Sequence, residues 1–166
     1  DARGVCAEIV FAEPGLRPNV DARLAIITDD IYEKLVYGME FHTLPQIAPD
    51  LAERTLVING LSKSHAFTGA RYGYCAGHPK WIATINKMIS QSSTHGPTIV
   101  QAGALAALQE PENFLVEWRA DYLRRRDYVL QELKAMGIPC ARPDGAFYVF
   151  PNISGALGKE SNGVAC

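Results

Sequence analysis

The sequence predicts an α/β fold, because short apolar strands alternate along it with longer helical segments. Residues 24–28 and 55–58 are continuous apolar runs rich in β-branched residues, a pattern typical of strands that are buried on both faces. Residues 79–90, 98–109 and 112–136 instead space their apolar side chains at helical intervals. We therefore expect a parallel or mixed sheet that is covered by helices.

Composition bounds the class of protein. The 166 residues are 48% apolar and 20% charged with a net charge of −2, which is typical of a globular protein and unlike a nucleic-acid-binding surface. No apolar stretch has the length of a membrane span, and the first residues do not resemble a signal peptide, so we expect a cytoplasmic protein without membrane contact. The four scattered cysteines predict free thiols and no metal site.

The first predicted strand ends at two carboxylates. Asp29 stands at its carboxyl end, where open α/β sheets bind their ligands, and we interpret Asp30 as a helix N-cap. The proline and glycine content of residues 38–50 predicts a loop, and residues 50–54 read as a polar turn into the second strand.

The second predicted strand is followed by a lysine in a loop of small and hydroxyl residues. Lysine is almost never fully buried without a partner, so Lys63 is an unusual choice for packing and a suitable one for covalent chemistry with a carbonyl group. Arg71 follows eight residues later and opens another apolar run, residues 72–77.

The last predicted helix carries three consecutive arginines, residues 124–126. Acidic residues nearby favour a solvated helix face over a phosphate-binding or nucleic-acid-binding face. Gly137 stands where a helix C-cap is expected, and residues 147–150 predict a strand that Pro151 ends.

Three motifs, in the right order, resemble those of the class I aminotransferases, the aspartate aminotransferase family. Residues 29–35 resemble the segment that contacts the cofactor ring, and residues 145–151 resemble a strand of the small domain. Residues 60–73, read as Gly-x-Ser-Lys followed by Phe-x-Gly-x-Arg-x-Gly, resemble the cofactor attachment site. The similarity runs from about residue 26 to about residue 155.

The resemblance implies pyridoxal 5′-phosphate as cofactor and a role for each candidate residue. Lys63 would attach the cofactor covalently and then move a proton from the substrate Cα to the cofactor C4′. Asp29 would pair with the ring nitrogen, and Tyr32 would donate to the ring O3′. Arg71 would bind the phosphate, with Ser62 as a weaker second contact.

The resemblance also implies an architecture. Residues 1–115 would be part of the large domain and its sheet, with residues 1–20 divergent, and residues 116–166 would be the inter-domain helix and the start of the small domain. The family's Asn-Pro-x-x-Pro-x-Gly motif and its substrate-binding arginine have no counterpart here. We therefore expect a central fragment, from a truncated or frameshifted frame, that is inactive alone.

The activity implied is transfer of an amino group from an amino acid, such as aspartate or glutamate, to a 2-oxo acid by a homodimer. Two alternatives stay open. One is a non-catalytic cofactor-binding module of a transcription regulator, and the other is a lyase or decarboxylase on the same fold. The flanking sequence would test the first alternative, and an assay with amino acids and 2-oxoglutarate would test the second.

Overall fold

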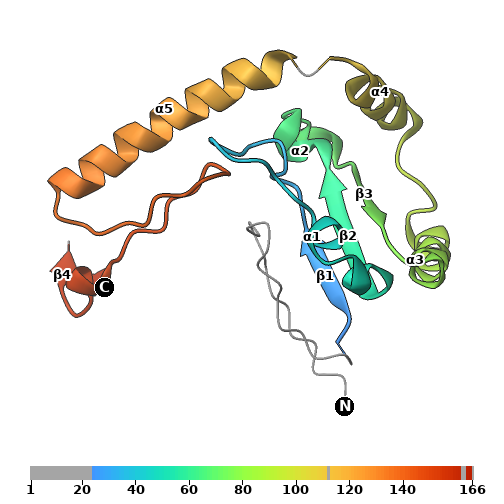
Figure 1. Cartoon of the computed structure of the whole chain (residues 1–166), viewed down its shortest axis with the longest axis horizontal. Helices are drawn as coiled ribbons and strands as arrows, with labels where there is room; N and C mark the ends of the chain where they lie inside the picture. The colour runs from blue at the N-terminus through green and yellow to red at the C-terminus, as the bar shows by residue number, and fades with distance from the viewer. Residues whose placement is uncertain (1–23, 112, 162–163, 166) are drawn as a thin grey trace. The chain divides into compact units, whose positions relative to one another are not determined.

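The computed structural model describes residues 24–111, 113–161 and 164–165. These residues form two compact units, whose chain can be followed in Figure 1. The first unit comprises residues 24–34 and 39–111, and the second comprises residues 35–38 with the described residues from 113 onward. The predicted divergent segment, residues 1–20, lies outside the described residues. The division into parts of a large and a small domain stays a prediction.

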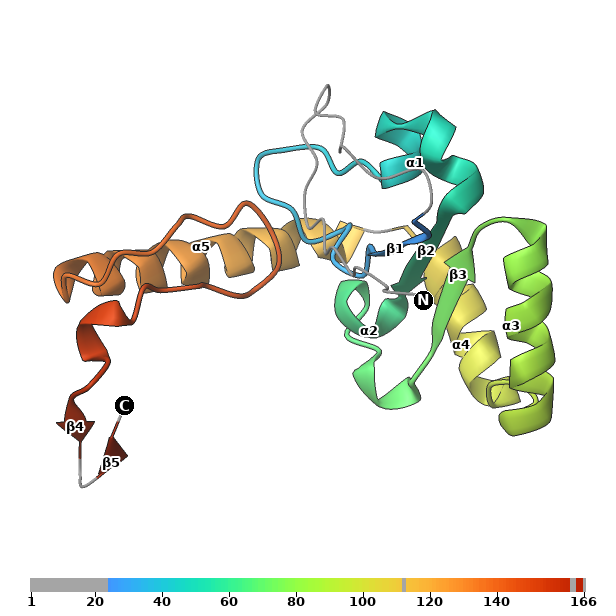
Figure 2. The same cartoon turned by 90° about the horizontal axis from the view of Figure 1, so that it is seen from below.

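A three-stranded mixed sheet lies in the first unit (Figure 2). Its strands, in spatial order, are β1 (Ile26–Asp29), β2 (Thr55–Gly60) and β3 (Gly73–Ala76). β1 runs parallel to β2, and β3 runs antiparallel to β2. The predicted α/β class and the two predicted strands are therefore confirmed.

One face of β1 is buried by the segment that follows it. That segment forms α1 (Leu44–Ile47) and the 3-10 helix η1 (Pro49–Arg54). Its buried apolar side chains make a small core cluster, against which two isoleucines pack: Leu44, Ala48 and Leu51, with Ile26 and Ile47. The hydroxyl of Thr55 donates to the carbonyl of Leu51 over 2.8 Å and joins η1 to β2.

The predicted loop over residues 38–50 is wrong in its second half. The side chain of Gln46 accepts a hydrogen bond from the backbone N–H of Thr43 over 2.8 Å, and Pro45 occupies the first turn, where a missing N–H costs nothing. A short helix therefore begins at Leu44, inside a stretch whose prolines suggested a loop.

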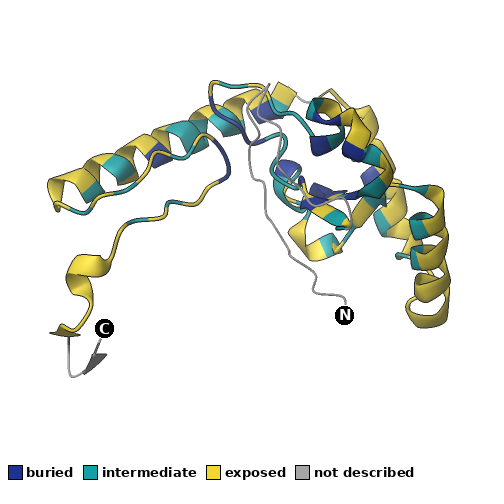
Figure 3. Cartoon of the chain, turned by 60° about the horizontal axis from the view of Figure 1, so that its bottom comes forward, coloured by how far each residue is buried: buried dark blue, intermediate teal, exposed yellow. Residues whose placement is uncertain are grey.

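Two of the remaining helices of the first unit were predicted, α3 (Pro79–Ser92), which runs two residues further than expected, and α4 (Thr98–Gln109). The predicted loop around Lys63 is wrong in part, because the N–H of His65 donates to the carbonyl of Leu61 over 3.1 Å and closes a helical turn. The short helix α2 (Leu61–Ser64) and the 3-10 helix η2 (Thr68–Ala70) form there. The Nδ1 atom of His78 caps α3 by accepting from the N–H of Lys80 over 3.2 Å. α3 has no buried residue, and Figure 3 shows it mostly exposed.

The second unit is organised along α5 (Asn113–Ala135). Gly137, with a φ of +70°, ends this helix as predicted, and the N–H of Ile138 reaches back to the carbonyl of Leu133 over 2.9 Å. Leu115 of the helix and Leu35 of the early segment are both fully buried. The unit also contains η3 (Ser154–Ala156) and the short strands β4 (Glu160–Ser161) and β5 (Val164–Ala165).

The predicted strand over residues 147–150 does not form. A strand needs a neighbour for its backbone hydrogen bonds, and here only isolated bridges occur beside the segment, Val36 with Gly145 and Cys140 with Pro151. Three aromatic side chains of the segment are exposed, Phe150 to 93%. The residue types suit a strand, but among the described residues no strand pairs with it.

The arginine run also departs from the prediction. Arg124 and Arg125 are exposed and pair with the carboxylate of Asp121 at 2.7 Å and 2.6 Å, as expected of a solvated face. Arg126 is buried instead, because successive residues of a helix are rotated by about 100°, so the third arginine faces a different side of α5 from Arg124. Within the described residues, no helix is long and apolar enough to cross a membrane.

Candidate functional site

The five candidate residues belong to segments that meet at one edge of the sheet. Parallel pairing places Asp29 beside Ile58, so β1 and β2 end at the same edge. Antiparallel pairing places Gly60 beside Gly73, so β3 begins at that edge. We call this the carboxyl edge: the ends of β1 and β2, the start of β3, and the segments that leave them, residues 29–34 and 60–73.

Asp29 is the last residue of β1, and its side chain is exposed. Its Oδ1 atom accepts a hydrogen bond from the backbone N–H of Ile31 over 3.3 Å, which fixes the start of the turn that follows. Side chains alternate along a strand, so Asp29 lies on the same face as Ile27, which is 52% exposed. Tyr32 follows within the turn and is half-buried.

Asp30 lies on the opposite, buried face. Its interpretation as a helix N-cap is wrong, because residues 31–34 form turns, and it is the backbone carbonyl of Asp30 that accepts the N–H of Glu33, over 2.9 Å. Burial raises the pKa of the Asp30 carboxyl from 3.8 to about 6, although the hydroxyl of Thr28 lowers it. Among the described residues, the Oδ2 atom of Asp30 has no hydrogen-bond partner.

This buried carboxyl was missed by the reasoning from sequence. The signal that could have found it was the alternation of β1, which puts Asp30 on the same face as Ile26 and Thr28. That face packs against α1 and η1 through Ile26, whereas a capping residue has to stay at the surface.

Lys63 stands directly beyond β2, in the short helix α2. A Cβ atom at Gly60, the last residue of β2, would meet the carbonyl of Tyr72 at 3.0 Å and the Cα of Gly73 at 3.2 Å. Glycine at this position therefore lets β2 and β3 approach closely and lets α2 begin at the edge itself. Ser62 and Lys63 are both half-buried there.

Arg71 closes the turn that leads into β3. Both Ala66, with a φ of 49°, and Arg71, with a φ of 54°, adopt the left-handed conformation, which reverses the chain between α2 and β3. The side chain of Arg71 is exposed, and its Nη1 atom donates to the carbonyl of Thr68 over 3.1 Å. Left-handed backbone in non-glycine residues is a mild strain that often accompanies a functional site.

The carboxyl edge thus gathers side chains of complementary chemistry: a carboxylate, a phenol, a hydroxyl, an amine and a guanidinium, from Asp29, Tyr32, Ser62, Lys63 and Arg71. Such a set can bind an anion, hold a proton at a ring nitrogen or oxygen, and attack a carbonyl carbon. No group of three or more metal-binding side chains occurs among the described residues.

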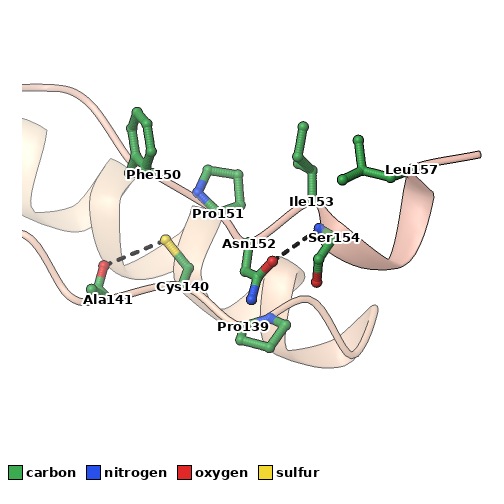
Figure 4. Close-up of a pocket in the computed structure, with 9 residues that line it drawn as sticks. All are labelled: Pro139, Cys140, Ala141, Phe150, Pro151, Asn152, Ile153, Ser154 and Leu157. Carbon is green, nitrogen blue, oxygen red and sulfur yellow. Dashed lines mark hydrogen bonds between the residues drawn. The ribbon is translucent and has the colours of Figure 1, made fainter. Parts of the chain in front are cut away.

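The second unit contains a hollow of about 730 Å³ that none of the candidate residues lines. Its walls are mostly apolar and include Phe150, Ile153 and Leu157, and the only hydrogen bonds drawn within it in Figure 4 are local ones. The thiol of Cys140, for example, donates to the neighbouring carbonyl of Ala141. The polar side chains of the lining belong to Cys140, Asn152 and Ser154, and none of them was predicted to act in catalysis.

The sequence is similar to a known family and to named proteins. A profile of the family described as "Aminotransferase class I and II" matches residues 19–162. The aspartate/prephenate aminotransferase of Cereibacter sphaeroides is 46% identical over 142 residues, which are 84% of this chain and 36% of that protein. The aspartate aminotransferase of Bacillus subtilis is 40% identical over 131 residues, 78% of this chain and 33% of that protein.

Solved structures agree with the sequence matches. The crystal structure of the aspartate aminotransferase from Rhizobium meliloti superposes with a TM-score of 0.79 at 40% identity, covering 84% of this chain and 35% of that one. The aspartate aminotransferase from Thermus thermophilus with maleate superposes with a TM-score of 0.76 at 38% identity, covering 81% and 35%. The chain therefore spans about a third of the length of the relatives that it matches.

Proposed function

The chain belongs to the class I and II aminotransferase family, and we propose that the complete enzyme carrying this sequence transfers an amino group from an amino acid to a 2-oxo acid with pyridoxal 5′-phosphate. We call that complete enzyme the parent enzyme. The observation that carries the proposal is Lys63, an amine at the carboxyl edge of the sheet, in the same turn-rich edge as Asp29 and Arg71.

The chemistry of the side chains at the carboxyl edge supports this cofactor. Pyridoxal phosphate has an aldehyde, a ring nitrogen that must stay protonated, a ring oxygen and a phosphate, and it supplies an electron sink when bound. Lys63 is the amine for the aldehyde, and Asp29 is the anion for the ring nitrogen. Tyr32 is the donor for the ring oxygen.

The phosphate requires cationic and hydrogen-bonding groups. Arg71 supplies a planar guanidinium with an exposed side chain, and planar forks of this kind suit phosphate oxygens. Ser62 adds a hydroxyl in the same helix as Lys63. In the proposed reaction, the amine of Lys63 would take the proton from the substrate Cα as a general base.

The names of the relatives support a dicarboxylic amino acid as substrate. Several are aspartate aminotransferases, and one solved relative was crystallised with maleate, a small dicarboxylate. We therefore propose aspartate or glutamate as amino donor and 2-oxoglutarate as acceptor, in a cytoplasmic homodimer.

The decisive experiment replaces Lys63 by alanine in the parent enzyme. We expect the visible absorbance of the covalently held cofactor to disappear and turnover to fall by about 10²-fold to 10⁴-fold or more, because the proton at Cα loses its base. Lys87→Ala, at an exposed position of α3, is the matched control and should leave both unchanged.

The products separate the proposed activity from its alternatives. An aminotransferase forms glutamate from 2-oxoglutarate, whereas a decarboxylase releases carbon dioxide and a regulator module binds the cofactor without turnover. Unchanged turnover in Lys63→Ala would show that the assignment of the carboxyl edge is wrong.

A further inference from the structure

The loop that carries Arg71 joins α2 to β3 within the first unit. We call residues 66–72 the Arg71 loop. Ala66 and Arg71 both have a left-handed backbone, and the 3-10 helix η2 lies between them. Non-glycine residues keep this conformation only where their surroundings hold them there, so the contacts of the loop with other elements decide its shape.

The first of these contacts joins Phe67 to Gly103 of α4. A Cβ atom at Gly103 would lie 3.1 Å from the Cζ atom of Phe67 and 3.9 Å from both of its Cε atoms. The tip of the ring therefore occupies the space that a side chain at position 103 would fill. The backbone N–H of Phe67 also donates to the carbonyl of Leu61 over 3.2 Å, which joins this end of the loop to α2.

The second contact joins Tyr72 to Gly96, which precedes α4 by two residues. A Cβ atom at Gly96 would lie 3.4 Å and 3.5 Å from two ring atoms of Tyr72. The side chain of Gln101 donates to the carbonyl of Gly96 over 2.6 Å, so Gly96 is fixed to the start of α4. Both rings therefore rest on glycines of one hydrogen-bonded stretch, residues 96–103.

Arg71 lies between these two contacts, which we call the aromatic anchors: Phe67 with Gly103, and Tyr72 with Gly96. Arg71 follows Phe67 by four residues and directly precedes Tyr72. Its Nη1 atom donates to the carbonyl of Thr68, which belongs to the same loop. The guanidinium is thus tied to the loop itself and moves with it.

We propose that Phe67 and Tyr72 are positioning residues for Arg71, because their rings fix both ends of its loop against the glycines of α4 and the residue stretch before it. The inference rests on the proposed function, in which Arg71 binds the phosphate of the cofactor. A binding group has to lie within about 0.5 Å of its productive position. Displacing an anchor would therefore weaken phosphate binding without removing any group that touches the cofactor.

The test compares two ligands that differ in the phosphate group. Pyridoxal 5′-phosphate and pyridoxal present the same aldehyde to Lys63, but only the first has a phosphate for Arg71. Each ligand is titrated into the cofactor-free parent enzyme, and its dissociation constant is read from the visible absorbance of the Lys63-bound form. A positioning role for the anchors predicts that anchor variants change the first constant and leave the second unchanged.

The Phe67 anchor allows a size-compensation experiment. Gly103→Ala should weaken binding of pyridoxal phosphate about 3-fold to 10-fold, because the new methyl group displaces the ring of Phe67. Phe67→Leu should weaken it by a similar factor, because the shorter side chain leaves a gap at Gly103. The two changes together should restore the affinity to within about 2-fold of wild type, since the methyl group fills the gap.

The Tyr72 anchor depends on the ring and not on the hydroxyl. Tyr72→Leu should weaken binding of pyridoxal phosphate about 3-fold to 10-fold, whereas Tyr72→Phe keeps the ring and should keep the wild-type constant. Ala102→Ser adds one atom at an exposed position of α4 beside Gly103, and as the matched control it should change neither constant. If Phe67→Leu fails to fold, Gly103→Ala and Tyr72→Leu carry the test.

Two outcomes would overturn the inference while leaving the proposed function intact. One is wild-type affinity for pyridoxal phosphate in both Gly103→Ala and Tyr72→Leu. The other is an equal loss of affinity for pyridoxal, which would show that the anchors support the fold as a whole and not Arg71. A wild-type parent enzyme without Lys63-dependent absorbance with either ligand would instead overturn the proposed function, and this inference with it.

Discussion

The carboxyl edge contains Tyr32 and Arg71, and in the second unit the guanidinium of Arg126 lies over the ring of Tyr37 at 5.2 Å from its centroid. The protein treats the two arginines in opposite ways. Arg71 is exposed, and among the described residues its guanidinium donates to the carbonyl of Thr68. Arg126 is buried and donates from three nitrogen atoms to Asp127 and Pro143. Within the part of the chain that the structure describes, Arg71 keeps most of its donors available, whereas all three guanidinium nitrogen atoms of Arg126 donate to protein acceptors.

The difference separates side chains that can act on a ligand from side chains that hold structure. A buried guanidinium is tolerated only when the surrounding protein satisfies it, so its removal should be felt in stability. An exposed guanidinium contributes little to stability, so its removal should be felt in binding. Variants of three pairs of residues would test this distinction: Arg126 and Arg71, Asp30 and Asp29, and Gly60 and Gly69.

The two arginines offer the largest expected contrast. In the parent enzyme, Arg126→Met should lower the free energy of unfolding by about 3 kcal/mol, because the carbonyl of Pro143 loses its donor and Tyr37 loses its cation. Arg71→Met should change it by less than about 0.5 kcal/mol, since methionine accepts the left-handed backbone about as well as arginine does. Urea unfolding of the cofactor-free protein measures both.

For cofactor affinity we expect the reverse order, with a larger effect of Arg71→Met than of Arg126→Met. Arg71→Met should weaken binding of pyridoxal phosphate about 10-fold to 100-fold, the value of a lost charge-assisted hydrogen bond. Arg124→Met, at an exposed and surface-paired position, is the control for both measurements and should change neither. An Arg71→Met protein as unstable as Arg126→Met would show that the edge is structural.

Asp30 should show an intermediate effect that depends on pH. Because burial raises its pKa from 3.8 to about 6, the folded protein binds this proton more tightly than the unfolded chain does. The stability that Asp30 contributes is therefore complete below about pH 4 and is lost as the pH rises to about 6. Wild-type protein should lose stability over this window relative to Asp30→Asn.

Above pH 7, Asp30→Asn should be more stable than wild type by about 2 kcal/mol, somewhat less than the full linkage value because its amide must also be buried. Urea midpoints measured from pH 4 to pH 8 would check the sign. Asp29→Asn is the natural control, since the Asp29 side chain is exposed, and its curve should follow wild type. Parallel curves for Asp30→Asn and wild type would contradict the buried carboxyl.

Two glycines at the carboxyl edge should show the smallest effect. Gly60→Ala should destabilise the protein by about 1–2 kcal/mol, because its methyl group would meet backbone atoms of Tyr72 and Gly73 that cannot rotate away. Gly69→Ala has no atom within 4 Å of the new methyl group and should lie within about 0.5 kcal/mol of wild type. Equal melting temperatures for the two variants would show that the close approach of β2 and β3 can relax.

Local patterns in the sequence were enough to predict several elements. The apolar runs predicted β1 and β2, and the small, alanine-rich pattern predicted α4 with its bounds at residues 98 and 109. Gly137 predicted the end of α5. These features depend on local patterns, namely strand alternation, helical spacing and a left-handed cap. Such patterns involve residues that are close in sequence, so they can be recognised from the sequence alone. The motif around Lys63 differs from these features, because its candidate site was assigned by resemblance to a family, and the roles of its residues stay predictions.

Tertiary structure alone decided which side chains are covered and which strands find partners. The sequence around residues 147–150 has the composition of a strand, but pairing needs a neighbour that composition cannot supply. Arg126 has the same side chain as Arg124 and Arg125, yet only Arg126 meets Tyr37, from a segment 89 positions away in the chain. Asp30 is likewise 5% exposed although its neighbour Asp29 is exposed, which the presence of two successive aspartates does not predict. Each outcome depends on contacts between residues that are far apart in the sequence. Such contacts cannot be predicted from a local pattern of residues.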